Sequence, residues 1–172
     1  FRRKSNKWVK IDRIDLDADV ISISGDVIAI ASWNSTLGNV IHLYKYMPDL
    51  DGVVSIQDPI STGWVWSMDL SNNYLVYWDV NEDDAFIYRR EATNQTFVLH
   101  QQLNISGPYH NNGLALDNDI LVVRGDSDTH IFSEQNGSWV ETITLDQGYH
   151  RYALSGRQLL AMTPNEVYSD NI

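Results

Sequence analysis

The chain contains no cysteine, which excludes a disulfide framework and any metal site built from thiolates. It has no run of 18 or more apolar residues, so the sequence predicts no membrane-spanning helix. Basic residues are scarce: 12 Lys and Arg stand against 23 Asp and Glu, and the net charge is −11. A surface of this sign repels nucleic-acid phosphates and anionic membranes, so we expect neither as a partner.

The N-terminal end shows no signal-peptide pattern, and position 1 is Phe rather than Met. We therefore expect the natural N terminus to have been processed away or to lie outside this stretch. The absence of cysteine leaves the redox compartment open, because a larger β domain can fold without disulfides.

Aromatic residues are plentiful by contrast, with six Trp and nine Tyr. Aromatic side chains favour strands and cross-strand pairing. No apolar period of 3.6 residues and no helix cap competes with this signal. The composition therefore predicts an all-β fold.

A segment of about ten residues recurs four times without gaps. Each copy begins with apolar residues at alternate positions, passes through a polar pair such as Gly25-Asp26, and ends in a nearly continuous apolar run. The spacing is 47 residues from Ile23 to Leu70, 46 from Leu70 to Leu116 and 38 from Leu116 to Leu154. The copies are Ile21–Ile30, Met68–Tyr77, Leu114–Val123 and Tyr152–Ala161.

Each copy predicts a tight β-hairpin. Gly and Asn at the central pair tolerate the positive φ that two-residue primed turns require. The apolar run after the turn predicts a strand buried on both faces, with another sheet packed on each side. An inner strand between the blades of a β-propeller has this environment. We therefore expect five repeat positions to be buried: Leu70, Leu116, Ile120, Val122 and Leu154.

Two further strands follow each hairpin. The third-strand segments become polar at their ends and are Val40–Tyr46, Ala85–Arg90, Thr129–Glu134 and the shorter Glu166–Asp170. The fourth-strand segments alternate apolar and polar residues and are Val53–Ile56, Phe97–Leu103 and Trp139–Leu145. Four short strands per unit predict a β-propeller of four-stranded antiparallel blades, with hairpins starting near residues 20, 67, 113 and 151 of a single domain or fragment spanning 1–172.

The two ends of the chain bear on closure of the ring. Phe1–Arg3 resembles the end of a third strand, and Trp8–Ile14 matches the fourth strand that begins at Trp139. Residues 7–16 are therefore expected to be the outer strand of a preceding or ring-closing blade. Because a lone outer strand exposes unpaired backbone groups, it should pair with the C-terminal strand near Val167-Tyr168 or with strands outside these 172 residues. The first pairing closes a four-bladed ring, and the second makes the chain a segment of a larger propeller.

The hairpins and their flanks resemble the FG-GAP repeat of integrin α-subunit heads and many secreted proteins. Val20–Ala31 looks like the centre of that motif, and Ile41–Tyr44, Phe86–Tyr88 and His130–Phe132 look like its aromatic strand. The aromatic-glycine pair of the family is present only in reversed order, as in Gly63-Trp64 and Gly148-Tyr149. The resemblance implies a propeller that serves as an extracellular interaction or structural module, including cell adhesion.

Four Asn-x-Ser/Thr triplets fit the glycosylation pattern, and all four fall in predicted loops or at loop edges. They predict a secreted or extracellular glycoprotein. Two of them, at Asn94 and Asn136, sit in equivalent turns between third and fourth strands and should be exposed. The candidate glycosylation residues are Asn34, Asn94, Asn104 and Asn136.

One loop could hold a calcium ion. Integrin-type repeats often bind Ca²⁺ through an Asp-x-Asp-x-Asp-Gly loop, which this chain lacks. The nearest stretch offers alternating oxygen ligands at Asp79, Asn81 and Asp83, which could surround a hard cation. The same residue types also favour turns for backbone reasons alone, and that reading stays open.

The sequence favours binding over catalysis, because it contains no nucleophile or metalloprotease motif. Trp33, Trp64, Trp66 and Trp78 lie near hairpin ends, where they either grip a protein or sugar or pack between blades. Arg124-Gly125-Asp126 spells an adhesion tripeptide that the repeat itself also explains. We expect a non-catalytic scaffold for a protein partner or a larger assembly. The alternative is a carbohydrate-binding or hydrolytic propeller with a central pocket.

Overall fold

The computed structural model describes residues 2–4, 7–10, 12–105, 113–149, 151–163 and 167–172. Their regular elements are all β-strands, and no described helix is long and apolar enough to cross a membrane. Every described strand pair is antiparallel. The prediction of an all-β fold is confirmed.

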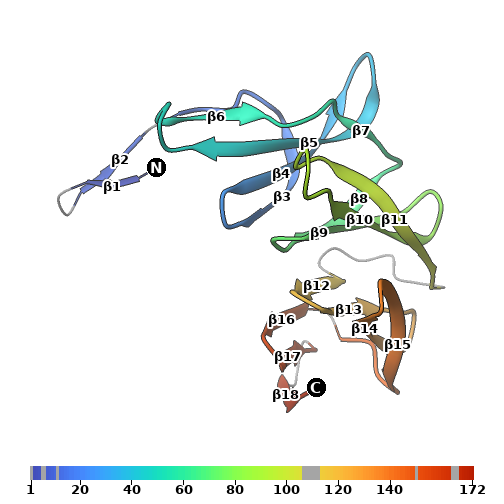
Figure 1. The fold of residues 1–172 in the computed structure, drawn as a ribbon. Coiled ribbons are helices and arrows are strands. Elements are labelled where there is room, and N and C mark those ends of the chain that lie inside the picture. Colours follow the sequence, from blue (N-terminus) through green and yellow to red (C-terminus); the bar gives the residue numbers. More distant parts are fainter. Residues whose placement is uncertain (1, 5–6, 11, 106–112, 150, 164–166) are drawn as a thin grey trace.

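Four sheets follow one another along the chain, and we call them blades 1 to 4 (Figure 1). Blade 1 contains β3 (Ala18–Ser24), β4 (Val27–Asn34), β5 (Gly38–Met47) and β6 (Gly52–Ser55), and the short β7 (Ile60–Ser61) also pairs with β5. Blade 2 contains β8 (Val65–Leu70), β9 (Tyr74–Asp79), β10 (Asp84–Arg90) and β11 (Phe97–Asn104). Blade 3 contains β12 (Leu114–Asp117), β13 (Ile120–Arg124), β14 (Thr129–Gln135) and β15 (Ser138–Leu145). Blade 4 contains three described strands, β16 (Arg151–Ser155), β17 (Gln158–Met162) and β18 (Val167–Asn171).

The inner hairpins turn where the repeat predicts. Gly25, Asn118 and Gly156 have φ values of 58°, 53° and 58°, in the left-handed region that primed turns use. The second hairpin differs, because neither Asn72 nor Asn73 has a positive φ. There the Ser71 side chain closes the turn by accepting a hydrogen bond from the Tyr74 amide at 3.2 Å. The backbone also closes this turn, because the Ser71 amide donates to the Tyr74 carbonyl at 2.8 Å.

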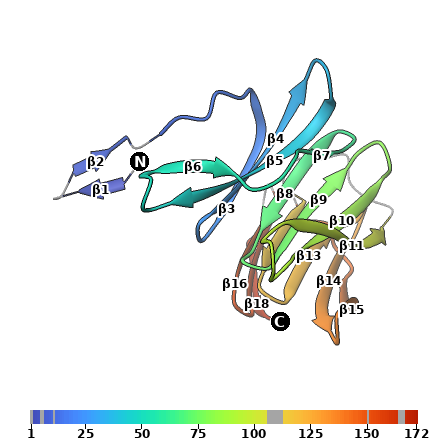
Figure 2. The ribbon, with the colours of Figure 1, turned by 45° about the horizontal axis from the view of Figure 1, so that its top comes forward.

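The blades stack face to face, with one apolar core between each pair. Side chains of blades 1 and 2 form the first core, those of blades 2 and 3 the second, and those of blades 3 and 4 the third. The first strands β3, β8, β12 and β16 lie side by side through this stack. Figure 2 shows the stack turned by 45° from the view of Figure 1. Consecutive blades around a shared inner edge are the arrangement of a β-propeller.

Alternate residues of each second strand face opposite neighbours. In blade 2, Leu75 and Tyr77 belong to the core shared with blade 1, whereas Val76 and Trp78 belong to the core shared with blade 3. Side chains on a strand alternate between its two faces, so this division follows from the pleat. We call the two sides the preceding face and the following face of a blade.

Four of the five repeat positions expected to be buried are buried: Leu70, Leu116, Ile120 and Val122. Leu154 is half-buried and packs at the edge of the third core. All of β9 and β13 is buried, as predicted for strands with a sheet on both sides. The prediction is wrong for β17, where Gln158, Leu160 and Met162 are exposed because no described element covers that face.

Asp69 connects three blades through its carboxylate. It accepts a hydrogen bond from the Ser22 hydroxyl of blade 1 at 2.9 Å and from the Leu116 amide of blade 3 at 2.8 Å. Asp69 is half-buried on β8, where neighbouring first strands lie close together. This charge-assisted bond to the Leu116 amide fixes how far blades 2 and 3 are shifted against each other along their strands.

A second repeated device joins the outer strands. The side-chain amide of Gln57 bonds both to the Phe97 amide at 2.5 Å and to the Phe97 carbonyl at 3.2 Å. Gln101 holds Trp139 in the same way, at 2.8 and 2.9 Å. In each case a glutamine of one blade forms hydrogen bonds with the backbone at the start of the fourth strand of the next blade. This bidentate contact sets the register between outer strands of successive blades.

The N-terminal segment departs from its prediction. Only Lys7–Val9 forms a strand there, β2, and it pairs with β1 (Arg2–Lys4) rather than with β18. Residues 12–17 are not in a strand, and Ile11 lies outside the described residues. The strand is thus shorter than the predicted Trp8–Ile14, and within this chain it does not pair with the C-terminal strand near Val167-Tyr168. Pairing with strands outside these 172 residues stays a prediction. A local antiparallel partner satisfies the backbone groups at lower entropic cost.

Candidate binding face

The turns of each blade divide between two ends of the sheets. Because neighbouring strands are antiparallel, the turns from second to third strand lie at the same end as the segments that enter the next blade. We call this end the loop face. Its described turns are 35–37, 80–83 and 125–128, and its described entering segments are 56–64 and 146–149.

Two tryptophans stand out on the loop face. Trp33 at the end of β4 is 63% exposed, and Trp64 just before β8 is 57% exposed. Trp66 is half-buried, whereas Trp78 and Trp139 are buried in the core between blades 2 and 3. Large indole surfaces are normally covered in a folded protein, so the exposed pair marks a surface suited to a partner.

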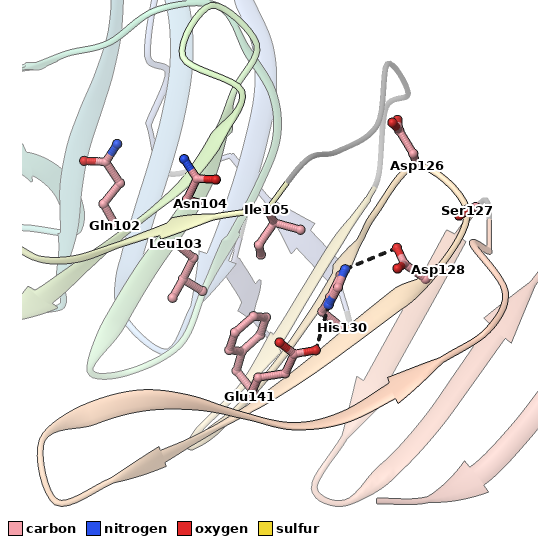
Figure 3. A pocket seen from close by; sticks show the side chains of 10 residues that line it. Gln102, Leu103, Asn104, Ile105, Asp126, Ser127, Asp128, His130 and Glu141 are labelled. Carbon is pink, nitrogen blue, oxygen red and sulfur yellow. Dashed lines mark hydrogen bonds and ion pairs between the residues drawn. The ribbon is translucent and has the colours of Figure 1, made fainter.

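A pocket of about 520 Å³ opens between blades 2 and 3 at the loop face (Figure 3). One wall is the end of β11, from Gln102 to Ile105, and the other comes from β14, β15 and the turn before β14. The polar side chains on the second wall are Asp126, Ser127, Asp128, His130 and Glu141. Three carboxylates thus gather in one concave site.

His130 lies between two of these carboxylates, as Figure 3 shows. Its Nδ1 is 2.8 Å from Glu141 Oε1, and its Nε2 is 3.2 Å from Asp128 Oδ1. Thr144 donates a hydrogen bond of 2.5 Å to the same Glu141 oxygen. This hydroxyl, together with the bond to His130, lowers the pKa of Glu141 below its usual value. Glu141 is therefore an anion at neutral pH.

The Arg-Gly-Asp tripeptide is not displayed as a unit. Arg124 ends β13 with a buried side chain, and Gly125 is also buried. Only Asp126 is exposed, and it lines the pocket. The structure therefore does not present the Arg124 side chain beside that of Asp126 at the surface.

The predicted calcium loop has its first carboxylate committed to backbone amides. Asp79 is buried and accepts hydrogen bonds from Gly63 at 2.6 Å and from Asn81 at 3.0 Å. Asn81 and Asp83 are exposed, and Asp83 has a φ of 59°. Among the described residues, no three His, Cys, Asp or Glu side chains are arranged to hold a metal ion. The geometry favours the turn-forming role, and calcium binding stays a prediction.

The four candidate glycosylation residues divide between the two ends. Asn94 and Asn136 are exposed in the turns between third and fourth strands, opposite the loop face, as predicted. Asn34 ends β4 and Asn104 ends β11, so both lie at the loop face. Ser106, the third residue of the Asn104 triplet, lies outside the described residues. Attachment of sugar at any of the four stays a prediction.

The pocket could not be found from the sequence. Asp128 and His130 are two residues apart on or next to one strand, but Glu141 reaches them only because β15 folds back beside β14. The pairing contains a register shift between Ile131 and Phe132, which no residue pattern predicts. The acidic residues around the 125–128 turn were the one visible signal.

Several solved structures resemble this chain in fold, and Hsv2 and Sqt1 among them are β-propellers. Hsv2 of Kluyveromyces lactis matches with 15% identity and a TM-score of 0.62, over 93% of this chain and 50% of that chain. A protein from Lactobacillus plantarum matches with 11% identity and a TM-score of 0.65, over 90% and 51%. Sqt1 of Saccharomyces cerevisiae matches with 11% identity and a TM-score of 0.60, over 91% and 45%.

The chain therefore spans about half the length of these solved structures. No protein-family model and no curated protein matches it. At these identities the likeness establishes the β-propeller fold and leaves the function to be argued from the site.

Proposed function

We propose that this chain is a non-catalytic protein-binding scaffold that docks a basic segment of a partner on its loop face. The observation that carries the proposal is the gathering of Trp33, Trp64 and an acidic pocket at one end of the blades. Indole surfaces supply apolar contact area, and Asp126 with Asp128 supplies negative charge for Lys or Arg. The net charge of −11 would also speed the approach of a basic partner.

A binding role fits the chemistry of the pocket better than a catalytic one. Both ring nitrogens of His130 already face carboxylates, so neither is free to activate a nucleophile. Asp69, at the inner edge of the blades, bonds to Ser22 and to the Leu116 amide and is committed to the scaffold. These engagements support the proposal that the chain is not an enzyme.

We place this function outside the cell and relate the blades to the FG-GAP type. The support is the set of four glycosylation triplets, of which Asn94 and Asn136 are exposed away from the loop face. Sugars there would leave the docking surface free. The sequence resemblance to FG-GAP repeats adds to this proposal through the centre of the motif at Val20–Ala31.

A glycan is the second candidate ligand, because exposed indoles also stack on sugar rings. The two candidate ligands differ in charge, so they should depend on different side chains. A neutral sugar would need Trp33 and Trp64 but not Asp126 or Asp128, whereas a basic peptide would need both pairs.

Peptides selected from a random displayed library test the proposal. Lys- and Arg-rich binders should emerge, lose at least tenfold in affinity for the double variant Trp33→Ala with Trp64→Ala, and weaken for Asp126→Asn with Asp128→Asn. Leu99→Ala, on the exposed outer strand β11, is the matched control and should bind normally. Binders that ignore both pairs of substitutions would contradict the proposal, and binding on a glycan array that needs only the tryptophans would favour the second candidate.

A further inference from the structure

The repeated contact between outer strands has a further copy nearer the N terminus. Gln57 follows Val53 by four residues and pins Phe97, and Gln101 follows Phe97 by four residues and pins Trp139. Asp12 follows Trp8 by four residues, and its carboxylate accepts a hydrogen bond of 3.0 Å from the Val53 amide. Trp8 therefore holds the position that Val53, Phe97 and Trp139 hold in blades 1 to 3. By this count, β2 is the fourth strand of a blade that would precede blade 1.

The register of the N-terminal hairpin agrees with this assignment. Arg3 lies opposite Trp8, as Arg90 lies opposite Phe97 and Glu134 opposite Trp139. The strand β1 thus occupies the third-strand position beside β2. The described residues contain no inner hairpin that would complete such a blade next to blade 1.

Blade 1 accordingly has an open preceding face. Ile21 and Ile23 are 56% and 65% exposed, although their equivalents in blades 2 and 3 are buried between blades. Together with Ile28 and Ile30 they line an apolar groove of about 750 Å³, bordered by residues 12–18 and Val53. An apolar face of this size calls for a covering sheet.

Blade 4 is incomplete in the opposite sense. Its described sheet has three strands and no fourth strand beside β18. Its following face is open, with Leu160 45% and Val167 67% exposed, although the equivalents of Leu160 in blades 2 and 3 are fully buried. Among the described residues, the C-terminal blade thus has an inner hairpin without an outer strand, and the N-terminal hairpin has an outer strand without an inner hairpin.

We propose that a second copy of this chain supplies each missing part, so that the following face of blade 4 in one copy packs on the preceding face of blade 1 in the other. The same contact repeated at the other end closes a ring of two copies. Within one chain the two open faces lie at opposite ends of the stack (Figure 1), so a single copy cannot join them.

Three observations favour a second copy as the occupant. Following faces pack on preceding faces at all three interfaces inside the chain, and the open pair is of the same kind. The chain spans about half the length of the matching solved structures, so two copies supply the length of one ring. The end of β18 holds the position equivalent to β1, because Ile172 bonds to the Arg157 carbonyl as Glu134 bonds to that of Asp119. It can therefore take the edge of β2 that β1 holds.

Sedimentation analysis of this 172-residue chain tests the assembly. We expect a concentration-dependent dimer with twice the mass of the 19.7 kDa chain. Ile23→Asp and Leu160→Asp should each give a monomer, since each places a carboxylate in both contacts of the ring. Both residues are exposed in one copy, so each variant should keep the circular dichroism spectrum of the wild type.

Mixing the two variants provides a sharper readout. A pair made of one Ile23→Asp chain and one Leu160→Asp chain keeps one unaltered contact, so the mixture should form heterodimers more weakly than the wild type forms dimers. Leu99→Asp, on the exposed side of β11, is the control and should dimerise normally. None of these residues belongs to the proposed partner site, so peptide binding at Trp33 and Trp64 can succeed or fail independently.

A monomer at every concentration, an open ladder of larger oligomers, a dimer that survives both substitutions, or no recovery on mixing would each overturn the proposal. The first of these results would mean that other polypeptide covers the open faces.

Discussion

The middle blades and the end blades carry the same repeat but bury it differently. Leu70 and Leu116, on the first strands of blades 2 and 3, are 4% and 6% exposed, whereas the equivalent Ile23 of blade 1 is 65% exposed. The side chains are of similar size and polarity. The difference arises because blades 2 and 3 have a sheet on each side and blade 1 has one on its following side only. An apolar repeat position thus specifies a place for a neighbouring sheet, and packing follows only where the neighbour is present.

Shortening the side chain to alanine at equivalent positions should give the largest difference in free energy of unfolding between the middle and end blades. Leu116→Ala should lower the free energy of unfolding by about 2–5 kcal/mol, because it leaves a cavity between blades 2 and 3. Ile23→Ala should change it by less than about 0.5 kcal/mol, because the side chain is already in solvent in the single chain. Urea titration of dilute protein measures both. Equal losses would show that blade 1 has a covered preceding face.

Alkaline titration should distinguish buried from exposed tyrosines. Burial raises the pKa of Tyr77, between blades 1 and 2, far above its usual value, and burial also raises the pKa of Tyr88. Their folded-state pKa values lie above the unfolded value of about 10, so the stability they contribute is complete below pH 10 and is lost as pH rises above it. For Tyr77 the loss should be about 1.4 kcal/mol per pH unit between the unfolded and folded pKa values.

Absorbance near 295 nm and circular dichroism, recorded together, test this coupling. Part of the tyrosine ionisation should coincide with unfolding. Full ionisation of all nine tyrosines near pH 10 with the sheets intact would contradict the burial of Tyr77.

Removal of the Asp69 carboxylate should weaken the connection among the first three blades. Asp69→Ala leaves the Leu116 amide and the Ser22 hydroxyl without their acceptor, at a cost of about 1–3 kcal/mol. Ser22→Ala removes only the weaker partner and should cost less. If both variants unfold at the same denaturant concentration as the wild type, the hydrogen bonds of Asp69 do not stabilise the contact among the first three blades.

Contacts between outer strands should likewise contribute more to stability in the middle blades than at the N-terminal end, with smaller effects than the changes above. Gln101→Ala removes two hydrogen bonds to Trp139 between blades 2 and 3, so we expect a loss of about 0.5–1.5 kcal/mol. Asp12→Ala removes two hydrogen bonds, from the Val53 and Arg13 amides, but the carboxylate is fully exposed, so the variant should cost less than Gln101→Ala. A larger effect at Asp12 would indicate that the N-terminal segment is packed as tightly as the interior blades.

Glycosylation should leave stability nearly unchanged. Expression through a eukaryotic secretory pathway should attach sugar at Asn94 or Asn136, because both are exposed in turns at the end opposite the loop face. Intact mass before and after glycosidase treatment, with Asn94→Gln and Asn136→Gln as controls, reports occupancy. An unchanged mass would remove the main support for an extracellular location.

The repeat predicted most of the fold, because each hairpin is specified by a short stretch of its own residues. The turn at Gly25 and the strand at Phe97 follow from local chemistry and alternation. Contacts between blades did not follow in the same way. The hydrogen bonds between Asp69 and Leu116 and between Gln101 and Trp139 join residues 47 and 38 positions apart. They depend on how far two stacked sheets are shifted against each other along their strands. The partner of the N-terminal strand was left open for the same reason, since both a distant and a local strand can satisfy its backbone.

Hydrogen exchange measured by mass spectrometry on the monomeric Leu160→Asp variant tests the stacked-blade account most directly. The account predicts the slowest exchange in β9 and β13, whose strands are buried on both faces, and faster exchange in β3 and β16, which border the open ends. Protection that is equal in all four strands, or highest in β3 or β16, would contradict it.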